Sequence, residues 1–333
     1  MIDSVSLTRQ VRMHSPREML SLGFRSACQH PSELCTHRAR WKLPGGDKKP
    51  HLTWSEAPNG SHWLSLTGSL QKFMFGSNVY PLSSDDEIRA CIEGTSQYVQ
   101  SVAQVSFDSF RAYVTRVDYC HDWRMTSGLV TQYLWALRGI SLPRMHKTLF
   151  DNCTIQLGNA SQTVCFYDKF KERSAMKSNS VEELAAAKGL LRFEMRLRDN
   201  RACERHVERL GVMDRTVQSM LTSDVARRTI SNTLERWGVD KPLSSGSKRL
   251  ELLRSHFADD RAKVIRLAGF LAMCDQYGSQ NLVDLGICSY TDYRRKLADV
   301  KAAGALFVTD GPRSLAPLTI VQELPSAEGS AAA

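Results

Sequence analysis

The 333-residue sequence lacks several features that would place it in a large class of proteins. Its nine cysteines are scattered singly without a CxxC pair, which disfavours a zinc ribbon or a thioredoxin-like redox motif. No apolar run approaches the roughly 20 residues of a membrane-spanning helix. There is no glycine-rich P-loop pattern, and no His-x-His pair occurs among the nine histidines. Phosphate binding by a P-loop and a metal site built on a histidine pair are therefore not expected.

The opening segment carries charge throughout and has no apolar core of signal-peptide length. We therefore expect a soluble protein of a reducing cytoplasm, with thiols that are mostly buried and inert. Apolar residues make up 42% of the chain and charged residues 24%, as in ordinary globular proteins. The net charge of +9 indicates a polyanionic partner, either nucleic acid or an anionic membrane surface.

The hydrophobic periodicity divides the chain into two folded parts and a tail. Strand and helix patterns alternate without a regular βαβ rhythm up to Asn200, and every periodic segment after it is helical. The pattern predicts an α+β domain over residues 1–210, an all-α domain over 211–312, and a disordered tail over 313–333. Within the first domain we expect an antiparallel sheet with helices packed on one face.

Three strands of the first domain each alternate between apolar and polar side chains, which must point to opposite faces of a sheet. These strands lie within residues 113–118, 163–169 and 190–198. If they are neighbours in one sheet, one face is apolar and the other is strongly polar. The side chains expected on the polar face are those of Arg116, Asp118, Cys165, Tyr167, Lys169, Arg192, Glu194, Arg196 and Arg198.

Two interpretations of this polar face remain open. Antiparallel sheets often have one solvated face, and mixed charge is typical of such a surface. The residue types also suit phosphoryl transfer to an enzyme hydroxyl. Two carboxylates on separate strands can hold one divalent cation, and a tyrosine with a lowered pKa can attack a phosphodiester. Lys169 and the arginines Arg116, Arg192 and Arg196 would then offset the charge on the phosphate.

Two further segments contain candidate DNA contacts. Lys72 lies between glycines in "GSLQKFMFG", where a lysine and backbone amides can contact phosphates, although an ordinary exposed lysine fits equally well. Near the C-terminus, a turn around Gly286 separates two helical patterns and resembles a helix–turn–helix. Arg294 and Arg295 would then lie early on the second helix with Tyr290 and Tyr293, where DNA-reading helices place base contacts.

Four segments in register resemble the gene II/X family of filamentous-phage replication initiators. They are "LTGSLQKFMFGSNVY", "TRVDYCHDWR", "FYDKFKE" and "LLRFEMRLR", and the opening "MIDSVSLTR" is also similar. The resemblance covers most of residues 1 to about 210. It implies a rolling-circle enzyme of the bacterial host cytoplasm that nicks and rejoins one DNA strand at an origin.

The resemblance also implies roles for individual residues. Tyr167 matches the tyrosine that forms a 5′-phosphotyrosine, exposed so that it reaches DNA. The family requires Mg²⁺ (or Mn²⁺), and Asp118 and Glu194 are the ligands expected by position and parity. Similar plasmid initiators add Glu172 as a third carboxylate. Whether a second tyrosine, such as Tyr113 or Tyr119, acts in termination is left open.

The partners implied are double-stranded origin DNA, the displaced single strand, and possible host helicase and polymerase, with an oligomer possible at the origin. A different class of function also fits the sequence: a non-catalytic protein that binds the origin and controls replication. It would bind DNA with a steep salt dependence and form no covalent adduct.

Overall fold

The computed structural model describes residues 1–12, 16–26, 39–43, 45, 48–138, 140, 142, 144–150, 153–176, 180–240, 246–277, 279–305 and 315–320. Within these residues a single antiparallel sheet of ten strands forms the centre of the protein, in the order β2-β3-β4-β5-β1-β6-β10-β9-β8-β7. The strands are β1 (Ile2–Val11), β2 (Arg25–Ser26), β3 (Ala39–Leu43), β4 (His51–Glu56), β5 (His62–Ser69), β6 (Tyr113–Arg124), β7 (His146–Phe150), β8 (Thr154–Gly158), β9 (Gln162–Asp168) and β10 (Leu190–Leu197).

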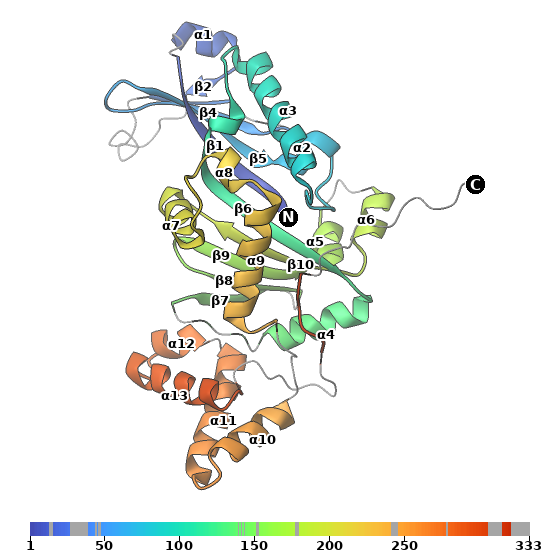
Figure 1. The fold of residues 1–333 in the computed structure, drawn as a ribbon, viewed down its shortest axis with the longest axis vertical. Helices are drawn as coiled ribbons and strands as arrows, with labels where there is room; N and C mark the ends of the chain where they lie inside the picture. Colours follow the sequence, from blue (N-terminus) through green and yellow to red (C-terminus); the bar gives the residue numbers. More distant parts are fainter. Residues whose placement is uncertain are drawn as a thin grey trace, which may run out of the picture.

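Helices connect the strands and then take over the C-terminal part of the chain (Figure 1). They are α1 (Pro16–Ser21), α2 (Leu70–Phe75), α3 (Asp85–Ala103), the 3₁₀ helix η2 (Ser109–Arg111), α4 (Ser127–Leu137), α5 (Lys169–Ser174), α6 (Val181–Ala187), α7 (Asn200–Leu210), α8 (Val217–Met220), α9 (Ser223–Trp237), α10 (Gly246–His256), α11 (Arg261–Tyr277), α12 (Ser279–Asp284) and α13 (Tyr290–Ala302). Across the described ranges, no helix combines the length and the apolar character needed to cross a bilayer.

Local sequence signals account for several of these elements. The capping box expected at Ser180 and Glu183 is present, and it starts α6. Gly189 makes the turn into β10 with φ of +74°, and a Cβ there would lie 2.1 Å from the Met125 carbonyl oxygen. Only glycine fits this position without a backbone shift, so it fixes where β10 starts.

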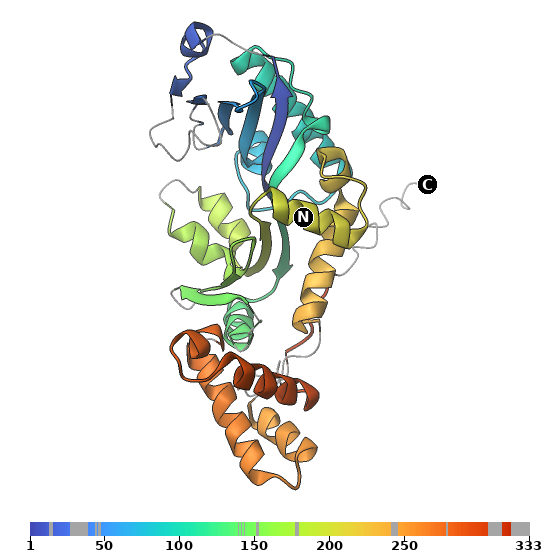
Figure 2. The ribbon, with the colours of Figure 1, turned by 90° about the vertical axis from the view of Figure 1, so that its left-hand side faces the viewer.

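The two faces of the sheet have different coverings. Apolar side chains of the sheet form a common core with residues of α3, α7, α8 and α9, which lie on one side of it (Figure 2). Trp237 of α9, for example, lies against Phe166 of β9, with ring centroids 6.0 Å apart. The short helices α5 and α6 lie on the other side of the sheet (Figure 2). The predicted α+β class, with an all-α C-terminal part, is confirmed.

The described residues contain two large apolar cores and a small cluster of Val79, Ala187 and Leu190. The core of the sheet extends past residue 210 through α9 to Val239, and it includes Leu315 and Leu318. A second core, from Leu253 to Ala305, belongs to α10, α11, α12 and α13. The division predicted at residue 210 remains a prediction, but α9 packs with the sheet rather than with the later helices.

A segment near the C-terminus is held against the sheet domain. The Leu318 N–H donates to the carbonyl of Val239, and the Tyr133 hydroxyl and the Trp123 indole donate to the carbonyls of Ala316 and Thr319. The expectation of a disordered tail is therefore wrong for residues 315–320. The rest of that predicted tail lies outside the described residues. No amphipathic period marks this segment in the sequence, because it is held mainly through its backbone carbonyls.

Candidate active site

The polar face predicted from strand parity exists, because β6, β10 and β9 are direct neighbours. Arg196 of β10 pairs in register with Asp118 of β6, and Arg192 pairs with Tyr167 of β9. Cross-strand partners in register project to the same face of a sheet. Asp118, Glu194, Arg196, Arg192 and Tyr167 therefore gather on one face, although they come from three separated parts of the sequence.

Two carboxylates and two arginines form the centre of this face. Arg116 holds Asp118 with both Nε and Nη2, at 3.1 and 2.7 Å. Arg196 contacts both acids: its Nε donates to Asp118 Oδ2 at 2.9 Å and its Nη2 to Glu194 Oε1 at 2.8 Å. Both carboxylates are buried, whereas the Arg196 side chain remains 36% exposed. Arg116 and Arg196, with side chains 32% and 36% exposed, are thus the parts of this network that a ligand at the surface can reach.

Tyr167 is part of the same network. Its hydroxyl donates to Glu194 Oε2 at 3.1 Å. Burial, followed by the negative charge of Glu194, raises the pKa of Tyr167 well above its ordinary value. Burial and the nearby Asp3 and Asp118 raise the pKa of Glu194 as well. The tyrosine therefore keeps its proton unless a base accepts it, and Glu194 is the base in contact with it.

Tyr167 is only 8% exposed, so the expectation of an exposed tyrosine is wrong. Strand parity gives the face of a sheet on which a side chain lies, but not what covers that face. Here α5 follows β9 directly and contacts both β9 and β10. A phosphate reaches the Tyr167 hydroxyl only if the surrounding side chains or α5 move.

Lys169 is not a strand residue, contrary to the parity prediction. Asp168 ends β9 and caps α5 by accepting from the N–H groups of Phe170 and Lys171. Lys169 is fully buried, pairs with Glu172 at 3.0 Å, and has its Nζ 5.7 Å from the centroid of the Tyr167 ring. Burial, followed by the charge of Arg192, lowers the pKa of Lys169. Lys169 does lie next to Tyr167, but it does so because α5 starts directly after the Asp168 cap and not because the two residues alternate along a strand.

Arg192 is placed differently from the other predicted DNA contacts. It is fully buried, and it holds both oxygens of Asp122 at 2.6 Å. It also donates to the backbone carbonyls of Asn78 and Val79, at 2.9 and 2.6 Å. Contrary to the expectation, Arg192 is therefore not accessible to DNA in this structure. It ties the segment after α2 to the sheet, where its charge is compensated by Asp122.

Asp3 belongs to the polar face but was missed by sequence reasoning. By simple alternation it shares a parity with Val5 and Leu7, which are core residues. A register shift between Ile2 and Ser4 in the pairing of β1 with β6 breaks this alternation. Asp3 accepts hydrogen bonds from Asn78 Nδ2 at 3.3 Å and Ser69 Oγ at 3.4 Å. A β-bulge of this kind re-aims a side chain, and no sequence signal for it was evident.

The carboxylates fit a divalent cation by their chemistry. Asp118 and Glu194 both hold the guanidinium of Arg196, so an oxygen of each faces the same small region. Mg²⁺ is commonly bound by one or two carboxylates together with substrate phosphate oxygens and water. Glu172 makes its ion pair with Lys169 instead. Over the residues that the structure describes, no cluster of three or more His, Cys, Asp or Glu is arranged around a metal position.

A basic pocket opens next to the polar face. It has a volume of about 220 Å³, and Ser69 and Asn78, the two partners of Asp3, contribute to its wall. Lys48, Lys49 and Lys72 line the rest of it with Ser4, His51 and Gly68. Lys72 lies on α2, which starts at the Ser69 cap, and not on a strand or loop. The predicted contact Lys72 thus stands beside two lysines that sequence reasoning did not select.

A second, adjoining pocket of about 340 Å³ extends this basic surface. Lys48 and Lys72 line it as well, together with Arg173 of α5 and Glu183 of α6. Arg173 donates to Asn78 Oδ1 and pairs with Glu183 at 2.9 Å. The two pockets share Lys48 and Lys72, and Asn78, which donates to Asp3, lines the smaller one.

The predicted helix–turn–helix is present only in part. Gly286, with φ of +69°, lies between α12 and α13, and Arg294 and Arg295 are exposed on α13. Tyr293, however, is fully buried in the second core, so its expected role in DNA reading is wrong. Arg295 pairs with Asp292 at 2.6 Å, and Lys296 pairs with the same carboxylate at 2.7 Å.

Three residues of β6 with reactive side chains, Tyr113, Tyr119 and His121, lie away from the polar face. His121 pairs in register with the core residue Phe193, and burial lowers its pKa to about 4. Tyr119 is fully buried and its hydroxyl donates to the Met220 carbonyl. Tyr113 lies five residues before Asp118 along β6 and is exposed. Its ring stacks on the guanidinium of Arg215. None of the three shares a contact with Tyr167 among the described residues.

Comparison with known proteins gives one family. A family model that describes the N-terminal region of a phage replication-associated protein, the gene II protein, matches residues 34–222, which is more than half of the chain. The matched region includes β6, β9 and β10 and so all the residues of the polar face except Asp3. None of the curated proteins matches the chain.

Proposed function

From the premise that this chain belongs to the gene II family of phage replication-associated proteins, we propose that it starts rolling-circle replication by nicking one strand of a phage or plasmid origin. The nick is made by Tyr167, which becomes joined to the 5′ phosphate, and the same enzyme later rejoins the strand. The observation that carries this proposal is the hydrogen bond from the Tyr167 hydroxyl to Glu194, a buried carboxylate with a raised pKa.

The chemistry follows from this contact. The Tyr167 oxygen attacks the phosphorus while its proton passes to Glu194 Oε2, 3.1 Å away. The bond from phosphorus to the 3′ oxygen breaks, and that oxygen takes a proton from water to become a free 3′-hydroxyl. The hydroxide left by the water takes the proton from Glu194 and restores the carboxylate. A carboxylate with a raised pKa is a stronger base, so the shift on Glu194 favours this proton transfer. Attack of a 3′-hydroxyl on the phosphotyrosine reverses the step and restores the tyrosine.

Charge on the phosphate must be offset as the bond forms. Arg196 is the cation nearest to both carboxylates, and it is exposed enough to turn toward a phosphate. Asp118 and Glu194 would hold Mg²⁺ or Mn²⁺ once Arg196 turns away. Such an ion, when bound, supplies Lewis-acid stabilisation of the phosphate oxygens. Lys169 lies within reach of the Tyr167 ring, where its charge is shared with Glu172.

The basic pockets beside Asp3 suggest how DNA approaches. Lys48, Lys49 and Lys72 form a positive surface at the edge of the polar face. Lysines there neutralise backbone phosphates without reading sequence. The origin strand would follow this surface, and the segment containing α5 and α6 would move to admit the scissile phosphate to Tyr167.

The test is a nicking assay on supercoiled DNA that carries the origin of the genome encoding the chain, with Mg²⁺ present. Wild type should give a nicked circle with protein on its 5′ end. Tyr167→Phe should lose both products by at least about a thousandfold, as expected when a nucleophile is removed. Tyr113→Phe is the matched control, because Tyr113 is exposed and makes no contact with the polar face. Equal nicking by wild type and Tyr167→Phe would refute the assignment.

One observation favours a second candidate, an origin-binding protein that does not cut. Tyr167 is buried, and arginines neutralise both carboxylates, which describes a stable structural network as well as a resting active site. Origin binding by wild type and Tyr167→Phe alike, with no nick from either, would establish this second function.

A further inference from the structure

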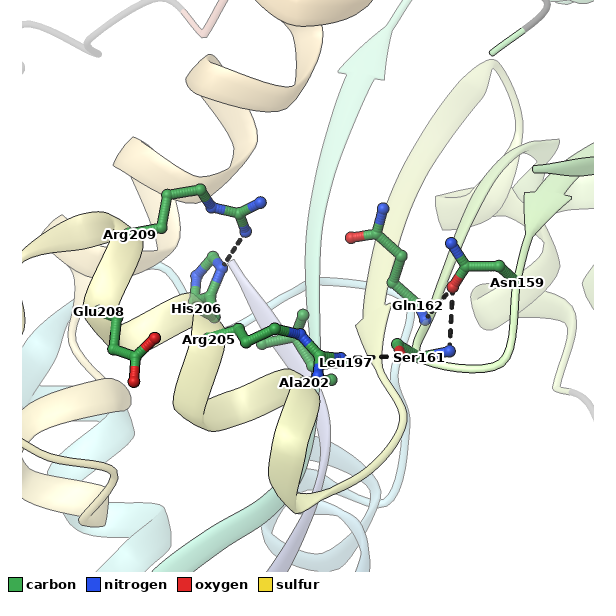
Figure 3. A pocket seen from close by; sticks show the side chains of 9 residues that line it. All are labelled: Asn159, Ser161, Gln162, Leu197, Ala202, Arg205, His206, Glu208 and Arg209. Atoms are coloured by element: carbon green, nitrogen blue, oxygen red, sulfur yellow. Dashed lines mark hydrogen bonds between the residues drawn. The ribbon is translucent and has the colours of Figure 1, made fainter. Parts of the chain in front are cut away.

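A third pocket lies at the other end of β9 from Tyr167. Its volume is about 660 Å³, which is in the range of nucleotide-sized ligand sites. Figure 3 shows its two walls. Asn159, Ser161 and Gln162 come from the turn between β8 and β9 and from the start of β9, whereas Ala202, Arg205, His206, Glu208 and Arg209 come from α7, and Leu197 ends β10.

The arginines of this pocket are held in place without a carboxylate. Arg205 donates to Ser161 Oγ at 2.8 Å, and Arg209 donates to His206 Nδ1 at 2.6 Å. Glu208 is the only acid among the described lining residues, and neither arginine makes an ion pair within the described part of the chain. Arg198 adds a third guanidinium at the rim through its contact with the Asn159 carbonyl.

His206 explains why Arg209 keeps its place. The Thr229 hydroxyl donates to the Val225 carbonyl at 2.6 Å, so its oxygen accepts from His206 Nε2 at 2.8 Å. Nδ1 of His206 is then free of a proton and accepts from Arg209. Burial, then the charges of Arg209 and Arg236, lower the pKa of His206 to about 3. The imidazole is therefore neutral at physiological pH and positions the guanidinium instead of repelling it.

We propose that this pocket binds single-stranded DNA, with Arg205 and Arg209 each on a backbone phosphate. Uncompensated guanidinium groups are the side chains best suited to phosphate, and they bind it in a bidentate manner. The serine and amide side chains of the opposite wall suit sugar and base edges, and Leu197 and Ala202 give an apolar floor for a base. An unpaired base can lie on this apolar floor, whereas a duplex keeps its bases paired and stacked, so the pocket favours a single strand.

The location separates this site from the nicking chemistry. Gln162 and Tyr167 stand near opposite ends of β9, roughly 17 Å apart along an extended strand. The inference extends the proposed function, because nicking produces a displaced single strand, but the pocket makes no use of Tyr167.

The experiment measures binding of a fluorescein-labelled oligothymidine single strand to the full chain by anisotropy, over a range of salt concentrations. Arg205→Ala/Arg209→Ala should weaken binding about tenfold and reduce the slope of log K against log salt by about 1.4, since each phosphate contact on a single strand contributes about 0.7. Arg89→Ala/Arg111→Ala is the control with the same loss of charge, at exposed positions on α3 and η2. By the same phosphate-contact reasoning, it should change affinity less than about twofold.

Further variants distinguish a failure of this proposal from a failure of folding or of the proposed nicking function. If the double variant does not fold, the single variants should each reduce the slope by about 0.7. A double variant that binds like the control would overturn the proposal, as would a loss confined to duplex DNA. Tyr167→Phe should bind the oligonucleotide like wild type. Should wild type bind the single strand through these arginines but fail to nick any origin, the proposed function fails and the pocket assignment stands.

Discussion

The two ends of β9 use arginine in opposite ways. At the Tyr167 end, Arg192 and Arg196 are matched to carboxylates, and the acids they hold are buried or nearly so. At the Gln162 end, Arg205 and Arg209 are fixed by a hydroxyl and a neutral imidazole and line an open pocket. A paired and buried arginine stabilises the fold, whereas a positioned arginine without a carboxylate is available to a phosphate. Residue type alone does not separate these roles.

The largest expected effect on stability is at Arg192. Arg192→Ala leaves Asp122 and the carbonyls of Asn78 and Val79 without their donor inside the protein. Removing one partner of a buried pair should lower the free energy of unfolding by about 3–5 kcal/mol. Arg205→Ala, at the open pocket, should change it by less than about 0.5 kcal/mol. Urea unfolding of both variants gives the comparison, and equal losses would contradict it.

The buried carboxyl group of Glu194 should make the stability of the protein depend on pH. Because the pKa of Glu194 is raised in the folded protein, the native state binds this proton more tightly than the unfolded state. Its contribution to stability is therefore present below the unfolded pKa of about 4.5 and is lost as pH rises through the folded value. Glu194→Gln should become progressively more stable relative to wild type as pH rises above about 4.5.

The control for this series is Glu93→Gln, an exposed position on α3. Its difference from wild type should stay nearly constant over the same pH range. Urea unfolding at each pH measures both variants. A flat difference for Glu194→Gln would show that the surrounding arginines fully compensate Glu194, and would contradict a raised pKa at this carboxyl.

A smaller effect is expected at the basic pocket beside Asp3. Lys48→Ala and Lys72→Ala should each weaken binding to origin duplex about 3- to 10-fold and reduce its salt slope by about 0.9. Both lysines line the two adjoining pockets there. Arg111→Ala, on the exposed η2 turn, should leave the slope unchanged. Unchanged slopes for both lysine variants would place the DNA path elsewhere.

The smallest effect is expected on α13. Arg295 and Lys296 share the charge of Asp292, so this helix has less free positive charge than its sequence suggests. Arg294→Ala/Arg295→Ala should weaken binding to origin duplex less than about threefold in the same titration. A loss of affinity of about tenfold or more would instead support α13 as the recognition helix predicted from the sequence.

Strand alternation predicted the polar face well, because period-two patterns fix which side chains share a face. It placed Tyr167, Asp118, Glu194 and Arg196 together before their contacts were known. It failed where geometry departs from regular alternation. The bulge at Asp3 and the helix cap at Asp168 each re-aim a side chain, and Lys169 was assigned to the wrong kind of element.

The sequence pattern also did not predict which charged side chains are buried or paired. Nothing in the local sequence of Arg192 indicates that the segment after α2 covers it, because Asn78 and Val79 lie 114 and 113 residues away along the chain. Lys48 reaches the same pocket as Lys72 through the pairing of β4 with β5, which brings distant residues together. Long-range contacts of this kind decide which charged residues remain available for binding.

The most direct test of Tyr167 as the nucleophile is to identify the residue that becomes attached to DNA. Wild type is incubated with Mg²⁺ and a single-stranded oligonucleotide carrying the nicked origin sequence, digested with protease and nuclease, and analysed by mass spectrometry. We predict a nucleotide phosphate on the peptide containing Tyr167, and no such peptide from Glu194→Gln at an equal reaction time. A modified peptide containing Tyr113 or another tyrosine, with Tyr167 unmodified, would contradict this assignment.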